Sequence, residues 1–240
     1  MKFYVKNWAA IAPGVWGQEG LESLAQTQAH SPAEIPFQLD FLKPAQRRRL
    51  TLTTKLALQA ATLVAPQDQL SRLPTVFVTR HGELANTVKV LAELEKDEIP
   101  SPTQFIHSVH GTAAGTFSIL LENVQASITL ANGPEELAPT LFEIASILHL
   151  GEAEELLVVF FDAPPVGQYA DYVHEPQFPY AAAFHFHKDR GELALELVDS
   201  GPAATAGPGP QSLSFASWLQ SGARAFPLLP QGGWQVLKAT

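Results

Sequence analysis

Residues 125–136 read Gln-Ala-Ser-Ile-Thr-Leu-Ala-Asn-Gly-Pro-Glu-Glu, and the fold prediction starts from this junction. The run from Gln125 to Ala131 contains β-branched and apolar residues and predicts a short strand. Asn132 and Gly133 predict a turn after it. A helix is expected from Pro134 to Leu148, because proline is tolerated in a first helical turn, where its missing N–H would have no partner. The junction therefore predicts a strand, a turn and a helix in direct succession.

Strands and helices alternate along the rest of the chain. The run from Leu156 to Phe161 is apolar throughout, which is typical of a strand buried on both faces. Residues 188–191 predict a hairpin turn between two strands, and residues 200–211, rich in Gly, Pro and Ala, predict a loop. Other strands are expected at residues 3–12, 75–78, 180–187 and 192–198, and helices at residues 45–64, 84–96, 108–121 and 212–219. This order predicts an α/β fold with a mixed sheet, followed by a tail that contains Trp234.

The composition points to a chain with a partner. Of 240 residues, 46% are hydrophobic and only 16% are charged, so we expect part of the surface to be buried against another subunit.

On the helix at residues 84–96, Leu84, Val88, Leu91 and Leu94 form an apolar stripe.

The charge and the absence of cysteine exclude several classes of function. The net charge is −9, from 15 basic and 24 acidic residues, and argues against nucleic-acid binding, which needs clustered cations. Arg47–Arg49 is expected to be a solvated helix face, with contact to a small anion or an acidic partner as the alternative. The sequence has no Cys, which excludes disulfides and thiolate chemistry. No window approaches the ~18 apolar residues of a membrane span, and we expect a cytoplasmic protein.

Three stretches carry a resemblance to a known family. They are Phe77–Leu84 (Phe-Val-Thr-Arg-His-Gly-Glu-Leu), the pair Ser101–Phe105 and Ser108–Gly115, and the strand Ser127–Ala131 with the helix after it. In this order and spacing they resemble the β-ketoacyl synthase-like N-terminal domain. Within that family the chain is similar to the short chain length factor proteins of bacterial aryl polyene clusters.

The resemblance implies a thiolase-like fold, truncated relative to a full ketosynthase. A domain of this type would span residues 1–200, with a loop, a short helix and a tail at 201–240. In the family, the position of Pro134 holds the nucleophilic Cys, whose partner residues lie well over 100 positions later. Only 106 residues follow Pro134 here (240 minus 134). No catalytic residue is therefore expected, and the resemblance implies a non-catalytic subunit without a cofactor or metal.

The expected partners follow from the same resemblance. The chain would form a heterodimer with a catalytic ketosynthase, through antiparallel contact of the strand at 125–131, and would help to set the acyl or polyene chain length. Acyl carrier protein would bind transiently. Bulky side chains of such a subunit would close the partner's acyl tunnel, and Phe117 is the main tunnel candidate, with Phe142 considered beside it. The full set of tunnel and interface candidates is Phe105, Thr112, Thr116, Phe117, Ser127, Ile128, Thr129 and Leu130.

Enzymatic alternatives remain open. Glu135 and Glu136 are expected at the N-terminus of the helix after Pro134, where they suit the helix dipole. One of them could act on a malonyl thioester as a decarboxylase. His185 and His187 lie on one side of a strand and could hold a metal, with Asp162 as third ligand, in a hydrolase.

Two further motifs are expected to be structural. His110-Gly111-Thr112 resembles an active-site motif of the family but lies before Pro134 instead of after it, and we expect it at a helix start. Arg80–Glu83 is expected to form a strand-to-helix turn that bends at Gly82, with contact to a substrate carrier as the alternative.

Overall fold

The computed structural model describes residues 1–24, 35–172, 178–201, 209–229 and 233–239. Its elements, in chain order, are β1 (Lys2–Ala12), β2 (Val15–Gly17), η1 (Leu21–Ser23), α2 (Pro44–Arg49), α3 (Leu52–Val64), α4 (Gln67–Leu70), β3 (Thr75–Val78), α5 (Leu84–Glu95), α6 (Pro102–Ile106), α7 (Thr112–Leu120), β4 (Ser127–Leu130), α8 (Leu137–Leu150), β5 (Glu155–Asp162), η2 (Gly167–Tyr172), β6 (Tyr180–His187), β7 (Leu193–Gly201), α9 (Gln211–Gln220), β8 (Ala225–Pro227) and β9 (Gly233–Lys238).

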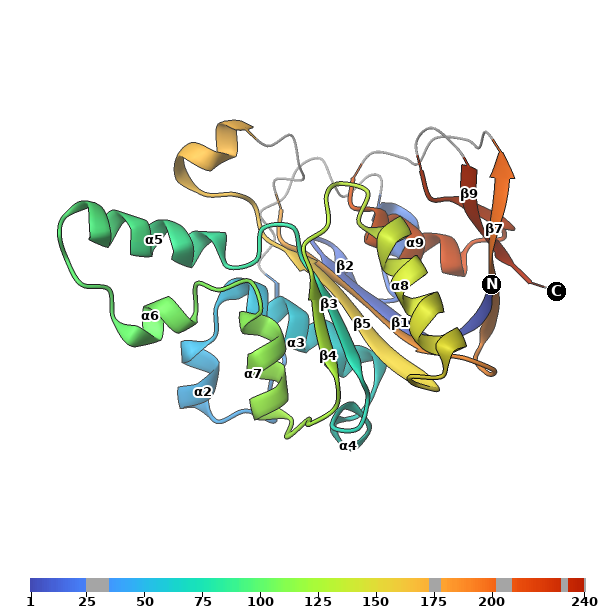
Figure 1. Cartoon of the computed structure of the whole chain (residues 1–240), viewed down its shortest axis with the longest axis horizontal. Helices are drawn as coiled ribbons and strands as arrows, with labels where there is room; N and C mark the ends of the chain where they lie inside the picture. Colours follow the sequence, from blue (N-terminus) through green and yellow to red (C-terminus); the bar gives the residue numbers. More distant parts are fainter. Residues whose placement is uncertain (25–34, 173–177, 202–208, 230–232, 240) are drawn as a thin grey trace.

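One mixed sheet organises the molecule, as the alternation of elements predicts (Figure 1). The strand order is β4-β3-β5-β6-β1-β7-β9-β8, with β2 paired to β1. Strand β3 runs parallel to β4 and β5, and the remaining pairs are antiparallel. Because parallel neighbours need crossover connections, the helices between these strands cover both faces of the sheet.

Helices on the two faces bury two separate cores. Alternate residues of β5 enter different cores: Val158 faces α8 and α9, whereas Val159 faces α3 and α7. This alternation explains the continuous apolar run of β5, because both of its faces are covered. The helix α3 lies over Ala181 and Ala183 of β6, and these short side chains leave room for its backbone to approach the sheet.

The predicted hairpin at residues 180–198 is wrong. Both β6 and β7 pair with β1, which lies between them. Val5 of β1 pairs with Phe186 on one side and with Leu193 on the other. The turn that links β6 to β7 passes over β1 so closely that a Cβ on Gly191 would stand 2.5 Å from the Val5 carbonyl oxygen. Residues that favour a turn predict where the chain reverses, but they do not show that a third strand lies between the two strands that the turn connects.

Three predicted helices have different limits in the structure. The helix expected at residues 45–64 is two helices, because Thr51 accepts a hydrogen bond on its side chain from the Thr54 N–H (3.1 Å) and begins α3 anew. The helix expected at residues 108–121 begins only at Thr112. The helix expected from Pro134 begins at Leu137, so Pro134 lies outside α8.

The C-terminal residues join the sheet and do not form the expected tail. Strands β8 and β9 extend the sheet beyond β7, on the far side of the predicted boundary at residue 200. The Trp234 ring stands edge-on to Phe142 with 4.8 Å between ring centroids. The expected helix at 212–219 is confirmed as α9, whereas the loop expected at 200–211 falls mostly on residues 202–208, outside the described residues.

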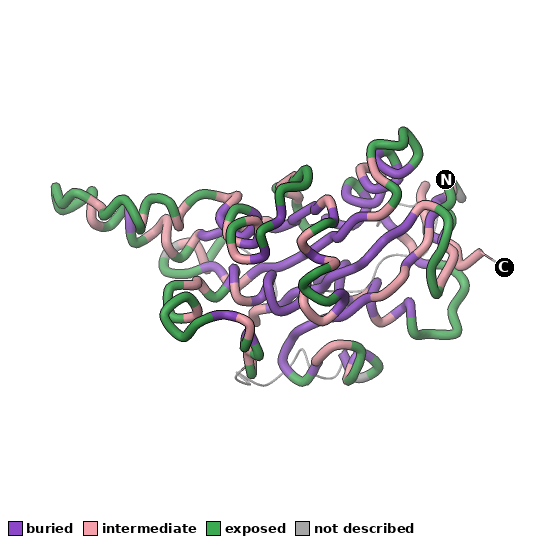
Figure 2. Tube along the Cα trace, turned by 90° about the horizontal axis from the view of Figure 1, so that it is seen from below, coloured by how far each residue is buried: buried purple, intermediate pink, exposed green. Residues whose placement is uncertain are grey.

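A projecting segment, residues 84–109, leaves the body of the molecule beside α7 (Figure 1). We call it the α5–α6 arm. Figure 2 shows that most of this segment is exposed or half-buried, in contrast to the buried sheet. Of the twelve residues of α5, only Val90 is buried. Among the described residues, no helix is both long and apolar enough to cross a membrane.

Candidate functional site

A buried carboxylate braces the turn after β3. Asp162, at the end of β5, accepts hydrogen bonds from the Thr79 hydroxyl (2.8 Å), the Arg80 N–H (2.8 Å) and the His81 N–H (3.0 Å). Burial raises the pKa of Asp162, although these three donors act in the opposite direction. Asp162 therefore holds the turn at the carboxyl ends of β3 and β5, the edge where α/β sheets commonly bind ligands.

The turn itself forms as the sequence predicts. Gly82 has φ +55°, and a Cβ there would stand 2.7 Å from Nδ1 of His110, so the bend requires glycine. His110 lies 2.9 Å from the Thr79 carbonyl oxygen through its Nε2 and packs this turn against the start of α7. The expected structural position of His110 at a helix start is confirmed.

Glu136 lies at the N-terminus of α8, as predicted, but its side chain turns to another helix. Its side chain makes no cap on α8. Its Oε1 accepts instead from the Ser212 hydroxyl (2.6 Å) and the Ser212 N–H (3.2 Å), at the N-terminus of α9. Gln211 reciprocates, because its Oε1 accepts from the Leu137 N–H (3.2 Å) at the start of α8. The two helices therefore cap each other across 74 to 76 residues of sequence.

Glu136 is only 4% exposed, and burial raises its pKa to about 7. Tyr180 donates to its Oε2 at 3.4 Å, and burial also raises the pKa of Tyr180 well above its usual value. Glu135, by contrast, is exposed. Of the two glutamates proposed as a polar site, only one points into the protein.

The space around Pro134 is small. A cavity of about 40 Å³ lies there, which is close to the share of one water molecule. It is lined by Arg80, Gly133, Pro134, Glu136, Tyr180, Gly209 and Pro210. These lining residues include no Cys, Ser or Thr; the Tyr180 hydroxyl donates to Glu136, which also accepts from Ser212. The described residues around Pro134 therefore enclose a space far smaller than a typical small-ligand site.

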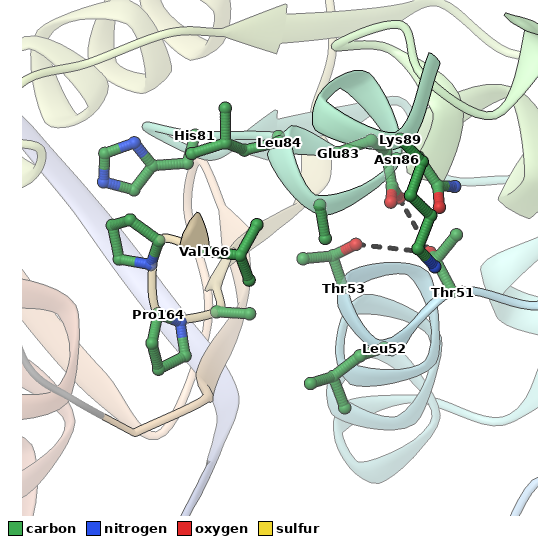
Figure 3. Close-up of a pocket in the computed structure, with 14 residues that line it drawn as sticks. Thr51, Leu52, Thr53, His81, Glu83, Leu84, Asn86, Lys89, Pro164 and Val166 are labelled. Atoms are coloured by element: carbon green, nitrogen blue, oxygen red, sulfur yellow. Dashed lines mark hydrogen bonds between the residues drawn. The ribbon is translucent and has the colours of Figure 1, made fainter. Parts of the chain in front are cut away.

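A larger cavity of about 430 Å³ opens on the other side of the turn, between the starts of α3 and α5 and residues 163–166 (Figure 3). Its volume is in the range of small-ligand sites. Among the described residues that line it, Glu83 is the one carboxylate, and its Oε1 accepts from the hydroxyls of Thr51 (2.8 Å) and Thr54 (3.0 Å). The remaining walls include apolar side chains such as Leu52 and Leu84. Glu83 therefore ties the two helix starts together at the cavity wall.

The two histidines of β6 do not meet Asp162. Asp162 pairs with Tyr180 at one end of the β5–β6 ladder, whereas His185 and His187 pair with Leu157 and Glu155 at the other. Their ring nitrogens have other partners: His185 Nε2 lies 3.1 Å from Glu155, and Arg190 donates to His187 Nε2 at 3.0 Å. No cluster of three metal-ligating side chains occurs among the described residues. The three-ligand arrangement that was kept as an alternative does not form, because the ends of a ladder lie a strand length apart.

The tunnel and interface candidates divide into two groups. Phe105, on the arm, is 61% exposed. Phe117, on α7, is 1% exposed and packs edge-on against Phe77, with 5.4 Å between centroids. Thr112 is buried and donates to the carbonyl oxygens of Ile106 and Val109, while Thr116 is half-buried. Thr112, Thr116 and Phe117 lie on α7, and Phe105 lies on α6, next to Ile106, whose carbonyl accepts from Thr112.

The other four candidates form β4, which is one of the two edge strands in the described sheet order. The Thr75 N–H donates to the Ala126 carbonyl and the Thr79 N–H donates to the Leu130 carbonyl. Because backbone polar groups alternate in direction along a strand, those of Ser127 and Thr129 point away from β3, to the open edge. Ile128 and Leu130 pack partly against the core below α8. An unpaired edge of this kind is a template for pairing with another chain.

Four exposed apolar side chains, which no prediction selected, lie in the segments that precede β4 in the chain. They are at the end of the arm, on α7 and on the loop before β4: Ile106, Val109, Ile119 and Val124. Exposed apolar side chains that form a contiguous patch are typical of a contact surface. The sequence signal was the low share of charged residues, which indicated a partner without locating it.

The basic run of α2 is solvated, as expected. Arg48 and Arg49 are exposed, and Arg47 pairs with the exposed Asp40 at 2.9 Å.

Comparison with known proteins agrees with this architecture. A family model described as "Beta-ketoacyl synthase, N-terminal domain" matches residues 17–231. Among solved structures, the chain is similar to the complex of the ketosynthase ApeO with its chain length factor ApeC from Xenorhabdus doucetiae, at 25% identity and a TM-score of 0.79. That match covers 99% of this chain and 100% of the other. A comparison with curated proteins gave no match.

Two further structures support the fold alone. One is the ishigamide ketosynthase/chain length factor, at 16% identity and a TM-score of 0.63, covering 83% of this chain and 68% of the other. The second is a β-ketoacyl synthase from Burkholderia phymatum STM815, at 9% identity and a TM-score of 0.61, covering 97% and 75%. The expected thiolase-like fold, shorter than a full ketosynthase, is confirmed.

Proposed function

Because the chain belongs to the β-ketoacyl synthase N-terminal domain family, we propose that it is a non-catalytic chain length factor that forms a heterodimer with a catalytic ketosynthase. One observation carries the proposal: β4 lies at an edge of the sheet and leads directly to Pro134, the position that the family resemblance assigns to the nucleophilic Cys. Such a junction would lack the nucleophile, and the edge offers backbone groups to a second subunit. The likeness over full length to a chain of a ketosynthase–chain length factor complex supports the same role.

In this role the chain contributes an interface and a tunnel wall to the complex, and no catalytic group. The open edge of β4 pairs with the corresponding strand of the ketosynthase, in antiparallel orientation, through the outward N–H and C=O groups of Ser127 and Thr129. Side chains of α6 and α7 then close the far end of the partner's acyl tunnel. Phe105 and Thr116 are the accessible members of that wall, and Phe117 supports them from the core. Tunnel depth sets how many elongation rounds the product undergoes.

The finer parts of the role rest on the sequence resemblance. The product is a polyene attached to an aryl head, and acyl carrier protein delivers the growing chain to the ketosynthase side. A cytoplasmic location belongs to the same set of predictions. The likeness to the ApeO–ApeC complex supports the product class only as a structural match.

The test is co-expression with the cognate catalytic ketosynthase, followed by size exclusion and mass analysis of the products. We expect a stable heterodimer and no turnover of malonyl thioester by this chain alone. Turnover by the isolated chain, with decarboxylation or with a bound metal, would support the enzymatic alternatives through Glu136 or the β6 histidines and would refute the proposal.

A matched pair of variants tests the edge itself. Thr129→Pro removes an N–H that faces the open edge and leaves the hydrogen bonds to β3 in place, a setting in which edge strands tolerate proline. Thr129→Val retains the N–H. We expect the proline variant to fold and to lose the ketosynthase, and the valine variant to keep it. Equal pairing by both variants would exclude β4 as the contact strand.

A further inference from the structure

The proposed function makes no use of the cavity of about 430 Å³ between the starts of α3 and α5 (Figure 3). Apolar side chains form much of its wall, among them Leu52, Leu84, Pro164, Pro165 and Val166. Cavities of this size, with apolar walls and a few polar groups, are typical of sites for small molecules. The polar groups of the wall decide which chemistry such a molecule needs.

Glu83 is a buried carboxylate in this wall. It is 5% exposed, and its Oε1 accepts from the hydroxyls of Thr51 and Thr54. Its Oε2 has no hydrogen-bond or ion-pair partner among the described residues. The buried side-chain atoms that lack a partner in the described structure are the ring nitrogens of Trp8 and Trp218, so Glu83 Oε2 is not sealed in the interior. Because Glu83 lines the cavity, a ligand there reaches this oxygen.

The hydroxyl groups beside Glu83 have no proton left to donate to a ligand. Thr51 donates its one hydroxyl proton to Glu83 at 2.8 Å. The contact of 3.2 Å between the hydroxyls of Thr51 and Thr53 therefore requires Thr53 to be the donor. The Thr53 oxygen keeps lone pairs, as does Glu83 Oε2. This part of the wall offers acceptors and no hydroxyl donor, so its ligand has to donate.

The other charged groups of the wall do not compensate Glu83. Lys89 is the one lysine or arginine among the described lining residues, and it is exposed, where water and salt screen its charge. It makes no ion pair with Glu83 in the described part of the chain. Burial lowers the pKa of His81, which favours the uncharged ring. A buried carboxylate without a compensating cation is unfavourable, so a cationic ligand would complete the site.

We propose that this cavity binds a small organic ammonium ion, a primary amine with an apolar body. The ammonium group donates to Glu83 Oε2 and to the Thr53 hydroxyl oxygen, and the apolar body lies against the leucine, proline and valine side chains of the wall. Hydrogen bonds between an ammonium group and a carboxylate are stronger than those between neutral groups, and burial of the apolar body adds to the affinity. The site is separate from the β4 edge and does not depend on the proposed function.

The experiment is calorimetric titration of the full chain with benzylamine at pH 7, where the amine is an ammonium ion, and with benzyl alcohol. The alcohol keeps the ring and a hydrogen-bond donor and lacks the charge. We expect benzylamine to bind at one site, at least tenfold more tightly than benzyl alcohol, and to raise the thermal midpoint of the chain. Equal affinities for the two compounds, or no binding of benzylamine, would overturn the inference.

Three variants locate the binding. Glu83→Gln keeps an oxygen for the two threonine hydroxyls and removes the charge, and Glu135→Gln removes the same charge at an exposed position outside the cavity. Val166→Trp fills the cavity from a wall residue that is 36% exposed and leaves Glu83 in place. We expect at least tenfold weaker binding of benzylamine to Glu83→Gln and Val166→Trp, and less than a twofold change for Glu135→Gln.

Thermal unfolding of each variant without ligand establishes that it folds. If Glu83→Gln does not fold, Val166→Trp decides the location. Wild-type affinity for benzylamine in a folded Glu83→Gln chain would show that the carboxylate does not hold the ligand, and wild-type affinity in Val166→Trp would place the ligand elsewhere. Each of these two results would overturn the inference.

Discussion

Replacement of Glu136 by Gln separates its structural role from its charge. The carboxamide keeps an oxygen that accepts from Ser212, and its NH₂ group can donate to the oxygen of Tyr180, so the capping of α9 is retained. Burial raises the pKa of Glu136 from 4.5 to about 7 in the folded chain. Between these values the folded chain keeps a proton that the unfolded chain has released. The contribution of Glu136 to stability is therefore greatest below pH 4.5, decreases as the pH rises, and levels off above about pH 7.

The size of this effect follows from the same two values. One pKa unit corresponds to about 1.36 kcal/mol, so a shift of roughly 2.5 units is worth about 3 kcal/mol in full, of which about 2.5 kcal/mol develops between pH 5 and pH 8. We expect the Glu136→Gln chain to gain about 2.5 kcal/mol of stability relative to wild type over that interval. Burial lowers the pKa of His81 and His185 as well, but both chains contain these groups, so their titration cancels in the difference.

The assay is urea unfolding of both full-length chains at pH 5, 6, 7 and 8, followed by tryptophan fluorescence, since Trp8 and Trp218 are buried. The free energies of unfolding are compared at each pH. A difference between the two chains that does not vary with pH would refute the reasoning, because it would mean that Glu136 has the same pKa in the folded and unfolded chains. A loss of stability at every pH would show that the carboxamide cannot replace the cap on α9.

Three other substitutions have defined outcomes. Phe117→Ala empties a buried site against Phe77 and should cost about 3–5 kcal/mol in urea unfolding; a loss below 1 kcal/mol would mean that the ring is not packed in the core. Asp162→Asn places an amide NH₂ against a turn that offers three donors, and it should lower the free energy of unfolding by about 1–3 kcal/mol. Urea unfolding measures this loss, and a stability equal to that of wild type would contradict the prediction. Gly82→Ala forces a Cβ against the His110 ring at a positive φ and should cost about 1–3 kcal/mol; a thermal midpoint equal to that of wild type would contradict this strain.

Local patterns predicted most strands and the class of the fold. The apolar run of β5 and the run at residues 3–12 became buried strands, because a strand covered on both faces leaves a clear signature in sequence. Gly82 was predicted as the bend of a turn and has the positive φ that such a bend requires. Helix limits were less reliable. Thr51 interrupts the predicted helix 45–64 with a new cap, and Pro134 stands three residues before α8 begins.

The candidate site depended on contacts between distant residues. The sequence predicted that Glu136 interacts with the N-terminus of its own helix. Its side chain instead accepts from Ser212, which lies 76 residues away. Leu91 and Leu94 belong to the apolar stripe predicted for residues 84–96, and only the structure shows that they are about half exposed. No periodicity can report whether an apolar face meets its own chain or another one.

Residue identity and local order were enough to exclude a cysteine, to predict an α/β fold and to indicate the β-ketoacyl synthase N-terminal domain family. The three-dimensional contacts were needed to show that β1 lies between β6 and β7, that α8 and α9 cap each other, and that β4 is an edge strand. The physical reason is that hydrogen-bond pairing and burial join segments far apart in the chain. Which segments pair depends on which of them reach the same strand edge or apolar face in the folded chain, and this is known only from the three-dimensional structure.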